Sequence, residues 1–400
     1  MTHGLHPYPA RMIPQVAGKL IDKYAKDSDV VCFDPFCGSG TVLVESKLRT
    51  IKSIGVDSNP LAILISKVKV TPISSEALLR ERSATFKGIT DDIASSSNVE
   101  IPKIKNLDYW FKPEVSTALA LIKNNIDAIR DNDVSDFYKV CFSLTVRKVS
   151  NTRPGEFKLF RIPENKLKSH KPDVVRVFFD TVDSNIHKMS EFFEYLKEND
   201  VASKVIKGDT RSLMDLCPDV IYEGCSNLLV TSPPYGDSHT TVAYGQFSRY
   251  SAAWLGFEDE EVWKMDKNSL GGKVFTISDD LESPTLSDTL ELIAKSDKFR
   301  AKETYSFFRD LDECFGKISK VMKQGNSHIC FVLGNRTVKR VQIPSDKILI
   351  ELGKKYGFKH LDTKHRGIPN KHMPARNAPE NVSSLMGDTM SKENIVIWKY

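Results

Sequence analysis

The segment DVVCFDPFCGSGT, residues 29–41, decides the predicted fold. Residues 29–33 contain a short apolar, β-branched run that is typical of a buried strand. Residues 34–40 follow as a turn that carries Gly38 and Gly40, and a helical pattern begins near Thr41. Such a turn suits a cofactor that approaches the backbone closely, because glycine has no Cβ and a helix start offers free N–H donors. We therefore predict a cofactor-binding loop at this strand-to-helix junction.

Short strands and helical stretches alternate in the rest of the chain. Further strands are predicted at residues 53–57, 203–206 and 227–230, with later candidates at 327–333 and 394–398. A helix is predicted after the strand at 53–57, where proline precedes an apolar run. This alternation predicts an α/β fold with a mostly parallel central sheet.

The alternation stops between the second and third of these strands. Helical patterns at residues 115–129 and 172–196 predict a largely helical insertion there, forming a cap or second domain. We therefore divide the chain into an α/β domain, residues 1–73 and 201–400, and an inserted helical domain, residues 74–200.

The composition is that of an ordinary globular protein, with 40% hydrophobic and 27% charged residues among 400. The sequence has no apolar run long enough to span a bilayer, and its first residues do not resemble a signal peptide. The seven cysteines are scattered and none forms a CxxC pair, which argues against a disulfide or metal framework. We expect a cytoplasmic protein with reduced thiols and no metal site.

Two features near the predicted loop separate the possible cofactor classes. Asp57 ends the second strand about twenty residues after the glycines, where a carboxylate accepts hydrogen bonds from a ribose diol. A dinucleotide fingerprint requires a third glycine at the position of Leu43, and a phosphate-binding Walker loop requires a lysine directly after Gly40. Both are absent, so the loop is either a different nucleotide-cofactor site or a tight turn whose glycines only permit packing.

A second motif, TSPPYG at residues 231–236, follows the strand at 227–230. Two successive prolines fix the backbone and leave carbonyl acceptors without N–H donors. The Ser232 hydroxyl beside those carbonyls makes an acceptor cluster suited to an amino group, and the Tyr235 ring offers a face for a flat heterocycle. The alternative is a proline-rich turn that only closes a buried strand.

The two motifs together resemble those of the amino-group DNA methyltransferases, in which DPFCGSGT is the cofactor signature and SPPY the catalytic one. The resemblance covers residues 3–70 and 200–400, and implies a Rossmann-like methyltransferase fold that binds S-adenosyl-L-methionine. It implies cofactor contacts from the opening segment, the loop and two acidic strand ends: His6, Pro7, Tyr8, Asp34, Pro35, Phe36, Gly38, Ser39, Gly40, Thr41, Asp57 and Asp209. It implies a catalytic set of Ser232, Pro233, Pro234 and Tyr235.

The serine form of the catalytic motif is associated in this family with methylation of the N4 amine of cytosine. The order of the motifs, with the cofactor loop first, is the reverse of that in many serine-form enzymes and keeps N6-adenine as the alternative. Both reactions require the target base to leave the duplex. A cytosine-C5 enzyme would need a cysteine nucleophile, and the catalytic loop contains none. An RNA guanine-N2 methyltransferase and a non-catalytic nucleic-acid-binding protein are more distant alternatives.

Double-stranded DNA is the expected partner, although the net charge of only +5 permits a polyanion without requiring one. Residues 147–171 hold most of the clustered lysines and arginines, and either contact DNA or form a solvated charged face. The predicted DNA contacts are Arg147, Lys148, Asn151, Arg153, Lys158 and Arg161. Residues 237–302 are an alternative interface, and Arg366, Lys371, His372 and Arg376 form a further basic loop. Family habit adds a cognate restriction endonuclease that acts on the same site.

Overall fold

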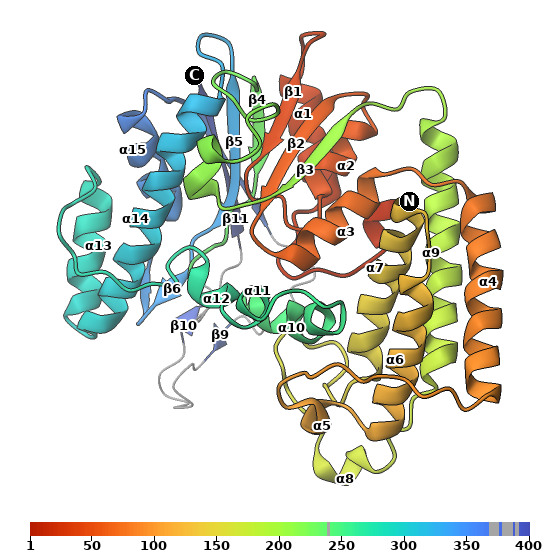
Figure 1. The fold of residues 1–400 in the computed structure, drawn as a ribbon. Helices are drawn as coiled ribbons and strands as arrows, with labels where there is room; N and C mark the ends of the chain where they lie inside the picture. Colours follow the sequence, from red (N-terminus) through yellow and green to blue (C-terminus); the bar gives the residue numbers. More distant parts are fainter. Residues whose placement is uncertain (238–240, 368–375, 378–386, 389–391) are drawn as a thin grey trace.

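The computed structural model describes residues 1–237, 241–367, 376–377, 387–388 and 392–400. Its centre is a seven-stranded sheet with the order β3-β2-β1-β4-β5-β11-β8 (Figure 1). The strands of this sheet are β1 (Val31–Asp34), β2 (Lys52–Asp57), β3 (Ser203–Lys207), β4 (Leu228–Thr231), β5 (His328–Gly334), β8 (Lys359–Gly367) and β11 (Lys392–Lys399). Two small hairpins pair β6 (Thr337–Val338) with β7 (Val341–Gln342) and β9 (Arg376–Asn377) with β10 (Gly387–Asp388).

Five strands, β3 to β5 in the sheet order, are parallel, and β11 runs antiparallel between β5 and β8. This confirms the predicted Rossmann-like α/β fold with a mostly parallel sheet. Each predicted strand occurs within two residues of its expected start. β8 was not predicted, because it lies at the sheet edge, where nearly all of its side chains are exposed and no apolar pattern marks it.

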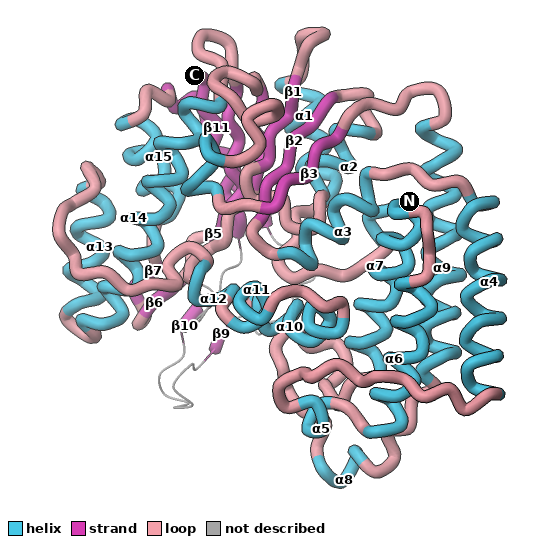
Figure 2. Tube along the Cα trace, in the orientation of Figure 1, coloured by secondary structure: helices cyan, strands magenta, loops and turns pink. Residues whose placement is uncertain are grey.

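Helices cover both faces of the sheet, as Figure 2 shows. Those outside the insertion are α1 (Pro14–Tyr24), α2 (Thr41–Lys47), α3 (Pro60–Val70), α10 (Tyr244–Trp254), α11 (Asp259–Trp263), α12 (Met265–Asn268), α13 (Pro284–Ala294), α14 (Lys298–Val321) and α15 (Ser345–Lys355). Alternate residues of one strand face opposite sides, so Cys32 packs with α1 whereas Phe33 packs with α14. Burial on both faces explains why the central strands read as continuous apolar runs.

The segment between α3 and β3 is helical, as predicted. It contains α4 (Ser75–Ala94), α5 (Leu107–Trp110), α6 (Pro113–Asp127), α7 (Asn132–Val149), α8 (Glu164–Leu167) and α9 (Val174–Leu196). One continuous apolar cluster joins Leu43 of α2 and Ile65 of α3 to Phe142 of α7 and Val182 of α9. The helical insertion therefore shares a core with α2 and α3, two helices that flank the sheet. The division at residues 74 and 200 remains a proposal based on sequence.

All seven cysteines are free thiols, and Cys217 is the exposed one. Within the described residues, no helix combines the length and the apolar character needed to cross a membrane.

Candidate functional site

A pocket opens beyond the carboxyl ends of β1, β2 and β4, at the position expected for ligands of a doubly wound sheet. It contains about 950 Å³ of empty space, part of it open to solvent. The pocket brings together residues from both predicted motifs: Tyr8, Asp34, Pro35, Phe36, Gly38, Ser39, Thr41, Asp57, Asp209, Ser232 and Pro234. Segments separated by almost two hundred positions in the sequence thus form one wall.

The other predicted site residues do not line this pocket. His6 is fully buried behind its wall, with its ring 6.0 Å from that of Phe247. Pro7 lies beside it at the surface. Gly40 has φ +79° and a Cβ there would meet Ser66 of α3, so this glycine permits close helix packing. Pro233 and Tyr235 are the members of the SPPY segment that do not line the pocket, whereas Ser232 and Pro234 do.

Asp57 holds the glycine loop in place. Its carboxylate accepts hydrogen bonds from the backbone N–H of Gly38 (2.9 Å) and of Asn59 (2.8 Å). Burial raises the pKa of Asp57 to about 6, although these backbone hydrogen bonds oppose the shift. The carboxylate therefore both shapes the loop and faces the pocket.

An aromatic wall closes the pocket on the side of the opening segment. The Tyr8 ring stacks on that of Tyr244 at a centroid distance of 5.9 Å, and the Asn59 amide donates to the Tyr8 hydroxyl (2.9 Å) and to Ser248 (2.7 Å). Asn59, whose side-chain amide oxygen caps α3, was not among the predicted site residues. Asparagine before proline at a helix start was an available signal.

Further lining residues come from the opening segment and from residues 237–302: Ala10, Arg11, Met12, Met265, Asp266, Ser269 and Leu270. Arg11 belongs to the opening segment that marked the resemblance, so its presence could have been predicted. The last four come from the irregular region 237–302, and the tertiary fold alone places them here.

A buried hydrogen bond joins the two motifs beneath the pocket. The Thr231 hydroxyl donates to the Asp34 carboxylate (2.6 Å), which also accepts from the backbone N–H of Phe36 (3.1 Å). Both side chains are almost fully buried. Burial raises the pKa of Asp34 to about 7, so the carboxyl group takes up a proton near neutral pH.

We expect Asp34→Asn to stabilise the protein at pH 8 and to flatten the pH dependence of its stability. The pKa of Asp34 is higher in the folded state than in the unfolded state. Its protonated form therefore contributes folding stability that is fully present below about pH 4 and is lost as the pH rises to about 7. The asparagine stays neutral and can still accept from Thr231. Urea unfolding at pH 5 and pH 8 should show that the two proteins differ by roughly 4 kcal/mol at pH 8, about 1.4 kcal/mol for each of about three pKa units, and by less at pH 5. Equal slopes against pH in both proteins would contradict the raised pKa.

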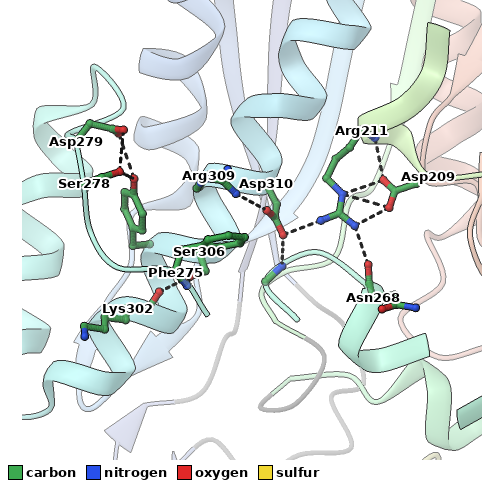
Figure 3. Close-up of polar contacts among 12 residues, drawn as sticks. Asp209, Arg211, Asn268, Phe275, Ser278, Asp279, Lys302, Ser306, Arg309 and Asp310 are labelled. Atoms are coloured by element: carbon green, nitrogen blue, oxygen red, sulfur yellow. Dashed lines mark hydrogen bonds and ion pairs between the residues drawn. The ribbon is translucent and has the colours of Figure 1, made fainter. Parts of the chain in front are cut away.

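Asp209 contacts the pocket but already has strong partners. Figure 3 shows Arg211 between Asp209 and Asp310, with guanidinium-to-carboxylate distances of 2.6 Å and 3.0 Å. Arg211 also donates to the backbone carbonyl of Asn268 (2.7 Å), and Asp310 accepts from the N–H of Gly271 (2.9 Å). This network fixes the floor of the pocket against α12.

The predicted catalytic motif lies at the end of β4 (Leu228–Thr231), with Ser232 at the pocket. The Ser232 hydroxyl donates to the Tyr235 hydroxyl (3.3 Å), which donates to a Glu393 carboxylate oxygen (3.2 Å). Burial raises the pKa of Tyr235, so its phenol stays neutral at physiological pH. The sequence analysis missed Glu393, because the contact depends on the pairing of the last strand with β5.

The predicted basic residues differ in what they contact. Arg153 is exposed, and its guanidinium lies 6.0 Å from the Phe160 ring. Arg161 stacks on Tyr109 at 4.2 Å and pairs with Glu164, whereas Lys148 donates to Thr181. Lys158 is half-buried in the same loop.

Two of these residues have structural roles. Arg147 stacks on the Phe247 ring at 3.9 Å and donates to the carbonyls of Phe247 and Glu156, so it ties the basic loop to α10. Asn151 is 2% exposed and donates to the Tyr109 carbonyl. The expectation that Asn151 contacts DNA is corrected, because its side chain is inside the protein. A polar residue in a loop sequence gave no sign of this burial.

The second predicted basic loop is only partly described. Arg366 pairs with Glu393 at 2.8 Å. Lys371 and His372 lie outside the described residues, and so does the side chain of Arg376.

Comparisons with known proteins find DNA methyltransferases. The DNA methylase family model N6_N4_Mtase matches residues 2–68. The chain is 39% identical over 416 aligned residues to the type II methyltransferase M.MvaI of Kocuria varians, which covers 100% of this chain and 91% of that protein. It is 22% identical over 354 residues to the type II methyltransferase M.MjaII of Methanocaldococcus jannaschii, covering 68% and 64% respectively.

Among solved structures, the rRNA methyltransferase aviRa of Streptomyces viridochromogenes aligns with 98% of this chain and 88% of its own, at 10% identity and a TM-score of 0.33.

Proposed function

This chain belongs to the N6/N4 family of DNA methyltransferases, and from that premise we propose that it methylates the exocyclic N4 amine of cytosine in DNA. The observation that carries the proposal is the presence of Ser232 in the pocket formed by the glycine loop. A methyl donor bound in the loop and a base held at Ser232 would be neighbours. The serine form of the motif supports cytosine, and N6-adenine is the alternative outcome of the test.

The pocket fits S-adenosylmethionine by its unused polar groups as well as its position. The buried hydroxyls of Ser39 and Thr41 have no hydrogen-bond partner among the described residues, and both side chains line the pocket. Buried hydroxyls are normally paired, so two unpaired ones in a pocket wall favour a polar ligand. Asp57 lines the pocket and would bind a ribose diol, and the Tyr8–Asn59 wall closes the opposite side. The cofactor supplies an electrophilic methyl group on a positively charged sulfur.

The chain's own groups would prepare the amine for attack. A cytosine amine is a poor nucleophile, because its lone pair is delocalised into the ring. Its two N–H groups would donate hydrogen bonds to the Ser232 hydroxyl oxygen and the Pro233 carbonyl. These hydrogen bonds would favour a tetrahedral nitrogen and free that lone pair. Tyr235 would stack on the extruded base and replace part of the stacking energy lost from the duplex. Positioning and electrostatics then supply most of the rate enhancement, and no covalent enzyme intermediate is needed.

The exposed part of the basic segment is the proposed DNA contact. It is connected to the site through Arg147, which bridges the loop carbonyl of Glu156 and the α10 carbonyl of Phe247. The Phe247 ring in turn contacts that of Tyr8 in the pocket wall at 5.7 Å. The loop that would hold the phosphates therefore lies two side chains from the pocket.

We expect simultaneous replacement of Arg153, Lys158 and Arg161 by alanine to weaken DNA binding and to reduce its salt dependence. Three lost phosphate contacts would lower the slope of log K against log salt by about 3, at roughly 0.9 per contact. Fluorescence anisotropy with a labelled duplex at several salt concentrations measures both quantities.

Two controls separate loss of charge from loss of structure in this experiment. Lys26, before β1, and Lys52 and Lys204, near the amino ends of β2 and β3, are exposed, whereas the pocket lies at the carboxyl ends of the strands. Their triple alanine variant removes the same charge. Arg161→Ala alone tests whether the Tyr109 stack merely holds the loop. Equal losses in the two triple variants would show that net charge, and not this surface, governs binding.

The direct test of the function is methyl transfer from labelled S-adenosylmethionine to bacterial DNA, followed by digestion and mass spectrometry of the nucleosides. N4-methylcytosine would establish the proposal. N6-methyladenine would retain the cofactor site and mechanism but reassign the base. Methylation of RNA alone, or of neither, would overturn the DNA substrate. A restriction endonuclease with the same recognition sequence is the proposed biological partner.

A further inference from the structure

A glutamate from the last strand contacts the catalytic motif from outside its own segment. Glu393 lies on β11, one residue after its start, and one of its carboxylate oxygens accepts from the Tyr235 hydroxyl at 3.2 Å. Tyr235 in turn accepts from the Ser232 hydroxyl at 3.3 Å. Of these three hydrogen-bonded residues, Ser232 is the one that lines the pocket.

The position of Glu393 is fixed by a neighbouring strand. Glu393 lies directly opposite Arg366 in the β11–β8 pairing, and the Arg366 guanidinium donates to its second carboxylate oxygen at 2.8 Å. The two side chains are 17% and 20% exposed, so water competes little for this ion pair. One carboxylate oxygen is therefore held by Arg366, and the other is left to face Tyr235.

The chemistry of these groups determines the direction of the hydrogen bonds. An ionised carboxylate can only accept, whereas a tyrosine or serine hydroxyl can both donate and accept. Because Tyr235 must donate to Glu393, its oxygen is left to accept from Ser232. The Ser232 proton then points away from the pocket, and its lone pairs face the pocket.

We propose that Glu393 is a positioning residue that sets this direction, so that Ser232 presents an acceptor, and not a donor, to the amino group of the target base. This inference rests on the proposed amine methylation. Without Glu393, the Tyr235 hydroxyl is free to donate to Ser232. The serine proton would then point into the pocket, where it opposes the N–H groups of the base.

Glu393→Gln reverses the direction of these hydrogen bonds while it keeps the size and shape of the side chain. Arg366 carries only donors, so it holds the glutamine carbonyl and turns the amide NH₂ toward Tyr235. The amide then donates to Tyr235, which donates to Ser232. We expect the single-turnover rate of methyl transfer to DNA to fall about tenfold or more, as for loss of one preorganised acceptor. Binding of S-adenosylhomocysteine, measured by calorimetry, should remain unchanged.

A double-mutant cycle distinguishes this role from a merely structural one. Tyr235→Phe keeps the ring but removes the hydroxyl that connects Glu393 to Ser232. In that background, Glu393→Gln should cause no further loss of rate. Asn394→Ala is the matched control, because Asn394 bonds His365 across the same two strands from the opposite face. It should keep the wild-type rate per folded molecule.

Three outcomes would be informative. A Glu393→Gln rate within twofold of wild type would overturn the inference, and so would an equal loss in the Tyr235→Phe background. If the wild-type protein transfers no methyl group to DNA, the proposed function fails. In that case the hydrogen bonds can still be tested by the thermal stabilities of the wild type, Glu393→Gln, Tyr235→Phe and the double variant. These stabilities should show that Glu393 and Tyr235 are energetically coupled.

Discussion

Replacing Ser232 by alanine is expected to slow methyl transfer to DNA by about two orders of magnitude, the typical effect of removing one preorganised polar group from an active site. Ser232 is the hydroxyl-bearing residue of the SPPY motif, and it lines the pocket that also contains Ser39 and Asp57. The loss should appear in the single-turnover rate with labelled S-adenosylmethionine. Affinity for S-adenosylhomocysteine should stay within about twofold, because the variant leaves the glycine loop and Asp57 intact.

The matched control for this variant is Ser226→Ala. Ser226 lies just before β4, at the amino end of the strand whose carboxyl end leads to Ser232, and its hydroxyl donates to the carbonyl of Val31 (2.7 Å). Its loss should cost about 1 kcal/mol of folding stability and leave the rate per folded molecule unchanged. If Ser232→Ala keeps more than a third of the wild-type rate, the serine is not part of the transfer step, and the Pro233 carbonyl must supply the hydrogen bond.

The elements that the sequence predicted well are those whose residues carry their structural role locally. A buried parallel strand such as β1 is an apolar run, and the turn after it needs glycine at positions with positive φ. Asp57 could be predicted at the pocket because ligands of doubly wound sheets bind beyond the carboxyl ends of the strands, and Asp57 ends the second strand. These signals depend on residue type and spacing, which the sequence shows directly.

The features that escaped prediction depend on contacts between distant segments. Asp266 reaches the pocket from an irregular region without a motif, and Glu393 meets Tyr235 only because β11 inserts between β5 and β8. Asn151 resembles a surface residue in the sequence, but its amide is bonded beneath the loop. In each case the residue type is ordinary, and only its tertiary neighbours reveal what it does.

The two glycines of the predicted cofactor loop, Gly38 and Gly40, show the same limit, because they are equivalent in the sequence but not in the structure. A Cβ on Gly38 would have the Tyr8 ring as its nearest neighbour, at 3.4 Å, which is ordinary contact. A Cβ on Gly40 would lie 2.4 Å from the Ser66 hydroxyl oxygen and 3.2 Å from the Ser66 Cα. Gly40 therefore allows α3 to pack closely against the loop, whereas Gly38 borders the ligand space.

We expect Gly40→Ala to destabilise the fold by about 2–4 kcal/mol, the sum of a positive-φ penalty and an overpacked contact. Gly38→Ala should cost only about 1 kcal/mol, because its strain comes from φ alone. Urea unfolding of both variants measures these values. Adding Ser66→Ala removes the closest atom and should restore part of the stability of Gly40→Ala, but none of that of Gly38→Ala. If Ser66→Ala fails to rescue Gly40→Ala, the loss comes from backbone strain in the loop and not from its contact with α3.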